Sequence, residues 1–519
     1  LVTKYEYNLI LIKYLKLLFI FLLLISLVNI WKKAEFFNYI DIYFIIIFYI
    51  ISLLTFDRYF LDEDEFSYWG KQLKLFLSIE NFFDIETQIH GGKFYHEPFI
   101  TSFQFFFVTL ADYKENLIIL ANTTILLSLF FLLFGKNLSN KFSLNFFLYF
   151  ISFYLLINNL SFGLVSIYAD PIIALFLASI LYYIFFLESK RENNLIIIFL
   201  LISILLSHRI GLLFFLLCII FYTFIKFELL LKNKKIFYIY SSSLLLILSF
   251  IFLFKKLIFS KTLYDLFKNN FSITDFLTNL YENVHYIYLS NIYFSKLGKS
   301  FNEILKNVNL QDYQIPVFNL SILFWSILTA ILILYSKKFK FFIAFLISLN
   351  FVIIIVFFEK VYLQNLSISV IGRYISILML AFLIIQINNL KNKKILILFI
   401  SLNVLFTPLK SFGFFVPDNI YYSKKENINF KNTRINIKDI AVYAKNCEYN
   451  YVNVYYDKEF FPNYLKKHYS LPLNILSYEI FPKKVKFFNI KDNYPVEIKN
   501  KCVIFLNISS SLRETENIN

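Results

Sequence analysis

Glycine and proline are scarce in this chain, which contains nine of each among 519 residues. Transporters that bind their cargo at the middle of the membrane usually interrupt helices there with glycine or proline, in both halves of the chain. The charged residues of this chain lie instead at the ends of its apolar runs, and no convincing internal repeat is found. A lipid or ion transporter is therefore the weaker alternative among membrane proteins.

The features of a nucleic-acid-binding protein are also absent. The net charge is +16, but neither a basic helix nor a zinc-ligand spacing accompanies it. Most of the cations lie in short loops between apolar runs, which is the distribution that the positive-inside rule produces. We therefore expect membrane lipids, and no nucleic acid, among the partners.

Long apolar runs dominate the sequence. Hydrophobic residues make up 59% of the chain and the mean hydropathy is +0.64, whereas soluble domains are about 45–50% apolar. The runs have roughly the 15–23 residues that cross the hydrocarbon core of a bilayer. The first run, residues 8–30, lacks a small-residue cleavage site and is interpreted as a retained helix.

We predict a polytopic α-helical membrane protein with about twelve transmembrane helices. The segment 99–111 is treated as a short amphipathic or re-entrant piece, because a spanning helix there would move every later loop to the other side. The predicted helices lie near residues 8–30, 38–56, 114–134, 143–159, 171–187, 194–207, 210–226, 236–254, 317–335, 341–358, 373–388 and 394–408.

Charge sorts the loops into two faces of the membrane. One set of loops carries sixteen cations and four carboxylates, so we assign it to the cytoplasm. The opposite, outer face receives the acidic loop 57–98, with nine carboxylates and four cations, and a second long loop, 255–316. We expect a multi-pass protein of the inner (cell) membrane with its functional site on the extracytoplasmic side.

The composition changes after the predicted membrane core, residues 1–410. Residues 411–519 alternate short helical and strand-like patterns between polar turns, which predicts a small extracytoplasmic α/β domain. Cys447 and Cys502 both lie in this domain, whereas Cys218 lies inside a predicted helix. Two cysteines on an oxidising side can form a disulfide, and two buried free thiols are the alternative.

The stretch LDEDEFSYWG, residues 61–70, places four consecutive carboxylates next to aromatic side chains. The simpler interpretation is a solvated loop end that helps to set the topology. The functional interpretation makes Asp64 and Glu65 candidate catalytic groups, because an aromatic surface at the membrane boundary desolvates a carboxylate and makes it a stronger base.

Other polar residues interrupt the apolar pattern and return to the same predicted face. Asp170 precedes Pro171 at a helix start, where it also fits an N-cap. Ionisable residues in apolar runs are costly and usually face a cavity or the interface, and simple snorkelling is the alternative for the cations. The candidate binding residues are His96, Glu97, Asp170, His208, Arg209, Arg373 and Tyr374.

These residues resemble the integral-membrane C-type glycosyltransferases, including the protein O-mannosyltransferase-like and lipid A-modifying branches. DEFSYWG is similar to the Asp-Glu-Phe-Ser-(His/Tyr)-Trp-Gly motif of their first outer loop, and the resemblance implies a general base at Asp64 with Glu65 beside it. SIYADP resembles their Tyr-x-Asp-Pro helix start and assigns Asp170 to it. The resemblance extends over roughly residues 1–410.

The remaining motifs match with departures. His96-Glu97-Pro98 resembles an acidic or histidine residue before a Pro-Pro pair, but Phe99 replaces the second proline, so the role falls on either His96 or Glu97. SHRIG resembles a Lys-x-x-Gly segment in which His208 or Arg209 replaces the lysine. GRY resembles an Arg-Tyr motif and gives Arg373 and Tyr374.

The resemblance implies an inverting transfer of one sugar from a polyprenyl-phosphate donor to a lipid, glycan or protein acceptor. Phosphate leaves readily, so a second carboxylic acid is not required. No cofactor is certain, although Asp64, Glu65 and His96 offer ligands to a divalent cation, Mg²⁺ or Mn²⁺. A polysaccharide polymerase or O-antigen ligase is an alternative with similar topology that needs no acidic first loop.

Overall fold

The computed structural model describes a defined part of the chain. The described residues are 39–56, 60, 65–78, 98–110, 113–135, 144–160, 164, 167–187, 191–207, 211–232, 272–289, 322–357, 371–390, 392–406, 424–447, 451–457, 470–480, 484–489 and 502–506.

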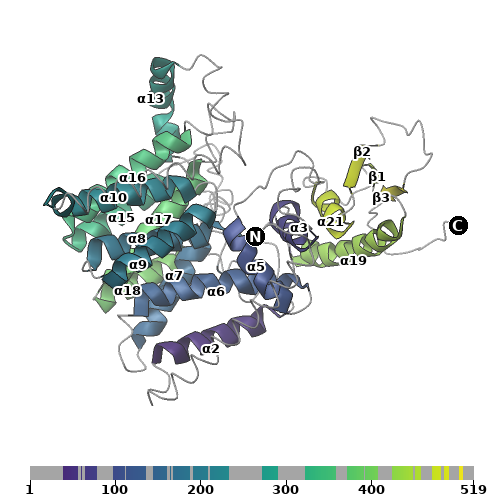
Figure 1. Cartoon of the computed structure of the whole chain (residues 1–519), viewed down its shortest axis with the longest axis horizontal. Helices are drawn as coiled ribbons and strands as arrows, with labels where there is room; N and C mark the ends of the chain where they lie inside the picture. The colour runs from purple at the N-terminus through teal and green to yellow at the C-terminus, as the bar shows by residue number, and fades with distance from the viewer. Residues whose placement is uncertain are drawn as a thin grey trace, which may run out of the picture.

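A bundle of apolar helices makes up most of the described structure (Figure 1). Ten of the twelve predicted helices are present within a few residues of their expected bounds, and the predicted helices at 8–30 and 236–254 lie outside the described residues. The ten helices are α2 (Tyr39–Leu54), α6 (Glu115–Phe134), α7 (Leu144–Leu160), α8 (Asp170–Phe186), α9 (Arg191–Ser207), α10 (Gly211–Lys232), α15 (Ile322–Tyr335), α16 (Phe339–Phe357), α17 (Ile371–Asn389) and α18 (Lys393–Phe406).

Helices also form in segments that were predicted as loops or short pieces. The piece predicted at 99–111 is the helix α5 (Pro98–Leu110), whose 13 residues rise only about 20 Å. The piece is therefore a short helix, as predicted. The helix α13 (Ile273–Leu289) lies in the long loop 255–316, and its Phe276 packs on Phe357 at the end of α16.

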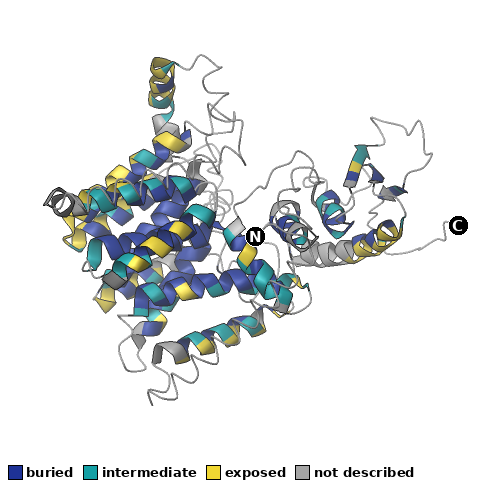
Figure 2. Cartoon of the chain, in the orientation of Figure 1, coloured by how far each residue is buried: buried dark blue, intermediate teal, exposed yellow. Residues whose placement is uncertain are grey.

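The helices α8 and α17 form the centre of the bundle and are buried along nearly their whole described length (Figure 2). The side chain of Tyr182, late in α8, forms a hydrogen bond with the side chain of Asn388, late in α17. The two helices therefore run parallel. Asn388 Nδ2 also donates to the carbonyl of Leu133 in α6, at 2.9 Å. The N-termini of α6, α8 and α17 therefore share one end of the bundle, called the site end below; the opposite end is called the far end.

Many apolar side chains lie on the outer surface of the bundle. Large apolar side chains of α2, α9, α15 and α16 are exposed, such as Tyr49, Phe199 and Ile331. Among the described helices, only α6 is long and apolar enough to cross a membrane by length and composition, and shorter apolar helices surround it. An exposed apolar surface of this extent is typical of contact with a membrane or a partner.

The C-terminal unit contains the helices α19 (Lys424–Asn446) and α21 (Ser470–Ile480) and a three-stranded parallel sheet. The strands β1 (Tyr451–Tyr456), β2 (Lys484–Asn489) and β3 (Cys502–Leu506) are arranged in the order β2-β1-β3. The predicted mixture of helices and strands in the tail is confirmed. Parallel strands require crossover connections, and α21 lies in the connection between β1 and β2.

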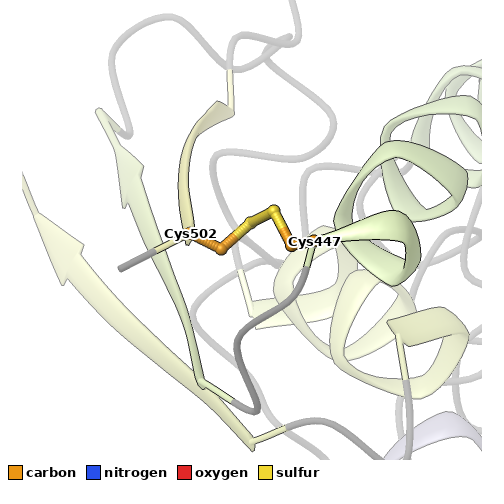
Figure 3. Close-up of a disulfide and its surroundings, with 2 residues drawn as sticks. All are labelled: Cys447 and Cys502. Carbon is orange, nitrogen blue, oxygen red and sulfur yellow. A yellow bond between two sulfur atoms is a disulfide. The ribbon is translucent and has the colours of Figure 1, made fainter. Parts of the chain in front are cut away.

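A disulfide joins Cys447, directly after α19, to Cys502 at the start of β3 (Figure 3). Of the two alternatives for these cysteines, the pair is therefore the one found, while Cys218 is free and buried in α10. The bond closes a loop with a sequence separation of 55. Closing a loop of this length removes unfolded-state entropy equivalent to about 4 kcal/mol in the chain-entropy account. Such bonds are consistent with an oxidising, extracytoplasmic compartment.

Candidate active site

The acidic motif forms a π-helical turn at the site end of the bundle. The turn η1 (Glu65–Gly70) has the sequence EFSYWG and leads directly into the short helix α3 (Lys71–Ser78). Glu65 is the first residue of the turn, and its side chain is buried. Asp64 lies outside the described residues. Single π-helical turns are rare and are frequent at functional sites, so this backbone favours the functional interpretation of the motif.

A cluster of three aromatic rings holds the turn. Phe60 and Phe66 pack edge to face with ring centroids 5.9 Å apart, and both contact Tyr478 of α21, at 5.8 and 5.5 Å. All three side chains are fully or almost fully buried. Aromatic pairs of this kind contribute about 0.5–1.5 kcal/mol each beyond the burial of apolar area. The C-terminal unit therefore contacts the acidic turn directly, and both lie at the site end.

Polar contacts fix the same tyrosine from two sides. Lys74 Nζ lies 3.5 Å above the centre of the Tyr478 ring and donates to the Tyr478 carbonyl at 2.6 Å. The hydroxyl of Tyr113 is 2.6 Å from that of Tyr478. Burial, followed by the nearby Tyr113 and Glu115, raises the pKa of Tyr478 well above its usual value. The phenol therefore stays neutral at physiological pH and keeps its hydrogen bond.

The N-terminus of α6 holds the chain just before the turn. The backbone N–H of Phe60 donates to a Glu115 carboxylate oxygen at 2.7 Å, and Asn116 Nδ2 donates to the carbonyl of Phe56 at 2.8 Å. Glu115 is the first residue of α6, where a negative charge is also favoured by the helix dipole. This pair of contacts fixes where the acidic loop leaves α2.

The turn also contacts the start of α8, which carries the second acidic motif. Trp69 packs edge to face on Tyr168, with ring centroids 6.5 Å apart. Tyr168 belongs to SIYADP, two residues before Asp170, and Asp170 is 2% exposed. The interpretation of Asp170 as the N-cap is wrong by one position, because Ala169 occupies the cap and Asp170 is the first residue of α8. A carboxylate in the first turn still complements the helix dipole.

The start of α17 lies at the same depth as the start of α8. Asp170 precedes Tyr182 by twelve residues and Tyr374 precedes Asn388 by fourteen, which correspond to about 18 and 21 Å of helix. Because Tyr182 and Asn388 are bonded and the helices are parallel, Asp170 and Tyr374 differ in depth by only a few Å. Tyr374 is buried. Arg373 belongs to the same first turn of α17, but its side chain lies outside the described residues.

The remaining predicted site residues are not described. Among the described residues, no group of three or more His, Cys, Asp and Glu side chains could hold a metal ion. Of the three metal ligands considered from the sequence, only Glu65 is described, so the cation stays a prediction. The predicted residues outside the described structure are Asp64, His96, Glu97, His208 and Arg209.

Four residues of the site were not expected from the sequence: Tyr478, Tyr113, Lys74 and Lys71. The polar contacts of Tyr478 join segments 365 to 404 residues apart, and no local pattern marks such pairs. Lys71 directly follows Gly70 and keeps a partly exposed side chain. Burial lowers the pKa of Lys71 to about 8. In the sequence, Lys71 is one of many lysines, and nothing in its neighbours indicates that it would be buried.

Comparison with known proteins does not identify a relative. No protein-family model matches the chain, and neither the curated proteins nor the solved structures contain a match.

Proposed function

We propose that the chain is a membrane-embedded glycosyltransferase that moves a sugar from a polyprenyl-phosphate donor to a lipid, glycan or protein acceptor. One observation carries the proposal. Glu65 and Asp170 are the buried carboxylates of the described bundle, they come from two separate motifs, and the contact between Trp69 and Tyr168 brings these motifs together. Buried carboxylates usually occur where they are paired or functional.

The position of these carboxylates favours an enzyme over a transporter. Each is the first residue of its helical element, η1 or α8, and both elements begin at the site end. A transporter site is expected at the middle of the membrane, whereas a transferase working on a lipid-linked sugar needs its groups at the level of the phosphate headgroup. The acidic turn also favours this class over a polymerase or ligase, which does not require it.

The proposed topology has about twelve transmembrane helices, with the site end facing outward. Two described features support it. The apolar surface of the bundle suits lipid, and the disulfide suits an oxidising compartment. Because the disulfide-bonded unit contacts η1 through Tyr478, the acidic turn faces the same compartment as the disulfide.

The proposed reaction is a single displacement at the anomeric carbon. A carboxylate, Asp64 or the adjacent Glu65, takes the proton of the acceptor hydroxyl while its oxygen forms the new bond to the anomeric carbon. The bond from that carbon to the phosphate oxygen breaks, and polyprenyl phosphate leaves with the electron pair. Attack from the face opposite the phosphate inverts the configuration. Arg373 is the candidate partner of the departing phosphate, since a guanidinium donates two parallel hydrogen bonds to it.

The test is a profile of glycolipids and glycans in a strain that lacks the gene. We expect one sugar to be missing from one product class, and mass spectrometry to show it restored by the wild-type chain. Complementation by Asp64→Asn and by Glu65→Gln identifies the base. An unchanged profile in the deletion strain, or full complementation by the variant that carries both substitutions, would contradict the proposal.

A further inference from the structure

We propose that the C-terminal unit is a positioning part of the candidate site, in which Tyr478 holds the η1 turn and thereby orients Glu65, its first residue. This inference rests on the proposed function for its consequence in catalysis, but its structural part stands independently. Tyr478 is a positioning residue here, because its described contacts are with Phe60, Phe66, Lys74 and Tyr113.

The fit between Tyr478 and the turn leaves no spare space. A Cβ added at Gly70 would lie 2.7 Å from ring carbons of both Phe60 and Tyr478, and 2.8 Å from the backbone oxygen of Glu65. Real Cβ atoms essentially never approach other atoms so closely. The last residue of the turn therefore lies close to Tyr478 and to the backbone of the first residue, and we expect a shift of Tyr478 to reach Glu65 by this route.

The polar contacts of Tyr478 connect the bundle, the turn and the C-terminal unit. Lys74 comes from α3, directly after the turn, and Tyr113 comes from the segment before α6. The same α6 accepts the backbone N–H of Phe60 through Glu115. The turn is thus fixed on the bundle side by the start of α6 and on the other side by α21, and these two supports meet at the paired hydroxyls of Tyr113 and Tyr478.

The C-terminal unit is built to hold α21 in place. In Figure 1, α3, α21 and α19 lie side by side at the edge of the bundle, and α21 packs on α19 and on β2. The disulfide ties the end of α19 to β3, the strand on the other side of β1 (Figure 3). The described elements α19 and β2, on which α21 packs, are thus joined through the disulfide and the sheet, and the unit offers the turn a firm support.

An experiment can distinguish the positioning role from a simpler one. In the simpler role, Tyr478 attaches the C-terminal unit to the bundle and has no effect on the turn. The attachment role predicts that mutation of Tyr478 lowers the amount of protein or speeds amide hydrogen exchange evenly along the chain. The enzyme that remains should have a normal kcat. A positioning role predicts a specific change in residues 65–78 and a fall in kcat with little change in KM. The three informative variants are Tyr478→Ala, Tyr478→Phe and Gly70→Ala, and Tyr443→Ala is the control, since Tyr443 of α19 is 66% exposed.

The experiment uses the full chain in detergent, with amide hydrogen exchange followed peptide by peptide and turnover measured on a panel of polyprenyl-phosphate hexoses. We expect Tyr478→Ala to speed exchange in residues 65–78 and to lower kcat roughly 10- to 100-fold, the usual cost of small displacements of a catalytic group. Tyr478→Phe keeps the ring packing, loses the phenol pair and should retain most of kcat. Gly70→Ala should reproduce both effects by crowding Phe60 and Tyr478 while both of these side chains are kept.

The outcomes separate this inference from the proposed function. If wild type transfers sugar and Tyr478→Ala leaves both kcat and the exchange of residues 65–78 unchanged, the positioning role is wrong and the proposed function stands. If neither wild type nor any variant transfers sugar, the proposed function fails, and the exchange of residues 65–78 alone decides whether Tyr478 holds the turn. If Tyr478→Ala does not accumulate, Gly70→Ala gives the same decision, because it crowds the contact between the turn and Tyr478.

Discussion

The two ends of the helical bundle are held together in different ways. At the far end, polar side chains of neighbouring helices bond to each other or to backbone carbonyls: Asn388 to Leu133, and Tyr149 to Leu390 at 3.2 Å. At the site end, the η1 turn depends on Tyr478, which comes from outside the bundle. The far end is thus a self-contained part of the bundle, whereas the site end is completed by the C-terminal unit.

This difference has a physical reason. Helices that are buried on all sides, such as α8 and α17, satisfy their backbone groups internally and need only close packing with their neighbours. A π-helical turn of six residues has few internal contacts, so its conformation must be imposed from outside. Mutations at the site end should therefore change the chemistry, and mutations at the far end should change the stability.

The largest effect is expected from the carboxylates. Asp64→Asn removes the candidate base with little change in shape and should lower sugar transfer by about 10²–10⁴-fold, while the protein accumulates normally. Glu65→Gln should have the smaller effect if Asp64 is the base. The measurement is product formation in the complemented deletion strain, normalised to protein amount. Near-normal transfer by Asp64→Asn with loss in Glu65→Gln would assign the base to Glu65.

The next effect concerns the disulfide. Cys447→Ser leaves Cys502 without a partner and should destabilise the C-terminal unit by about 4 kcal/mol, because the cross-link no longer restricts the unfolded chain. Limited proteolysis with gel analysis should show cleavage within the C-terminal unit while the bundle stays intact. Simultaneous cleavage of both regions would contradict the contrast between a self-contained bundle and a separately stabilised support.

Two glycines allow a matched comparison of crowding at two places. At Gly70, an added Cβ would collide with Phe60 and Tyr478. At Gly211, it would collide with the backbone carbonyl of Ile204 in the preceding helix α9. Overpacking of this kind typically costs about 1–3 kcal/mol. Gly70→Ala should lower transfer more than thermal stability, whereas Gly211→Ala should lower the midpoint of thermal unfolding by displacing α10 from α9. Equal effects of both variants on transfer would remove the special dependence of the turn.

The sequence predicted most helices because their signal is local. Runs such as 114–134 and 373–388 are apolar over a whole helix length, and the structure has α6 and α17 there. The start of α8 was missed by one residue because Asp170 and Pro171 fit an N-cap and a first helical residue equally well. The mixed character of the tail was also visible, since its strands alternate with polar turns.

The support of the turn was not predictable in the same way. Tyr478 lies in a short segment without a distinguishing motif, and its role comes from Phe66 and Lys74, about 400 residues away in the chain. A single sequence contains no signal for such a pairing, and 38 tyrosines make any one of them inconspicuous. The disulfide was left open for a related reason, because spacing alone does not show whether two cysteines meet.

A smaller effect is expected from the titration of Lys71. Its pKa in the folded chain is about 8, below the value near 10.5 of an exposed lysine, because burial disfavours the charged form. The unfolded chain therefore binds more protons between pH 8 and 10.5, and stability rises with pH across this window. Buried Tyr478 acts in the opposite direction above about pH 10.

The measurement is the midpoint of thermal unfolding between pH 7.5 and 9.5, below the range where tyrosine contributes. Lys71→Met removes the buried charge, so the variant should be more stable at pH 7.5, by roughly 1–2 kcal/mol after allowance for the partial exposure of the side chain. Its stability should also depend less on pH than that of the wild type. Parallel pH profiles for the two proteins would show that Lys71 does not titrate in this window.

The smallest expected effect compares one hydroxyl group at each end. Tyr149→Phe removes the hydrogen bond to the Leu390 carbonyl at the far end, and Tyr113→Phe removes the pair with Tyr478 at the site end. Each loss should cost about 1 kcal/mol, since the ring packing is kept. Thermal unfolding should therefore shift by similar small amounts in both variants. Of these two variants, only Tyr113→Phe should also show a fall in transfer, and a small one, because only that hydroxyl bonds to the residue that holds η1. A fall in transfer for Tyr149→Phe of the same size would mean that the far end also controls the site, and the two ends could no longer be treated as separate.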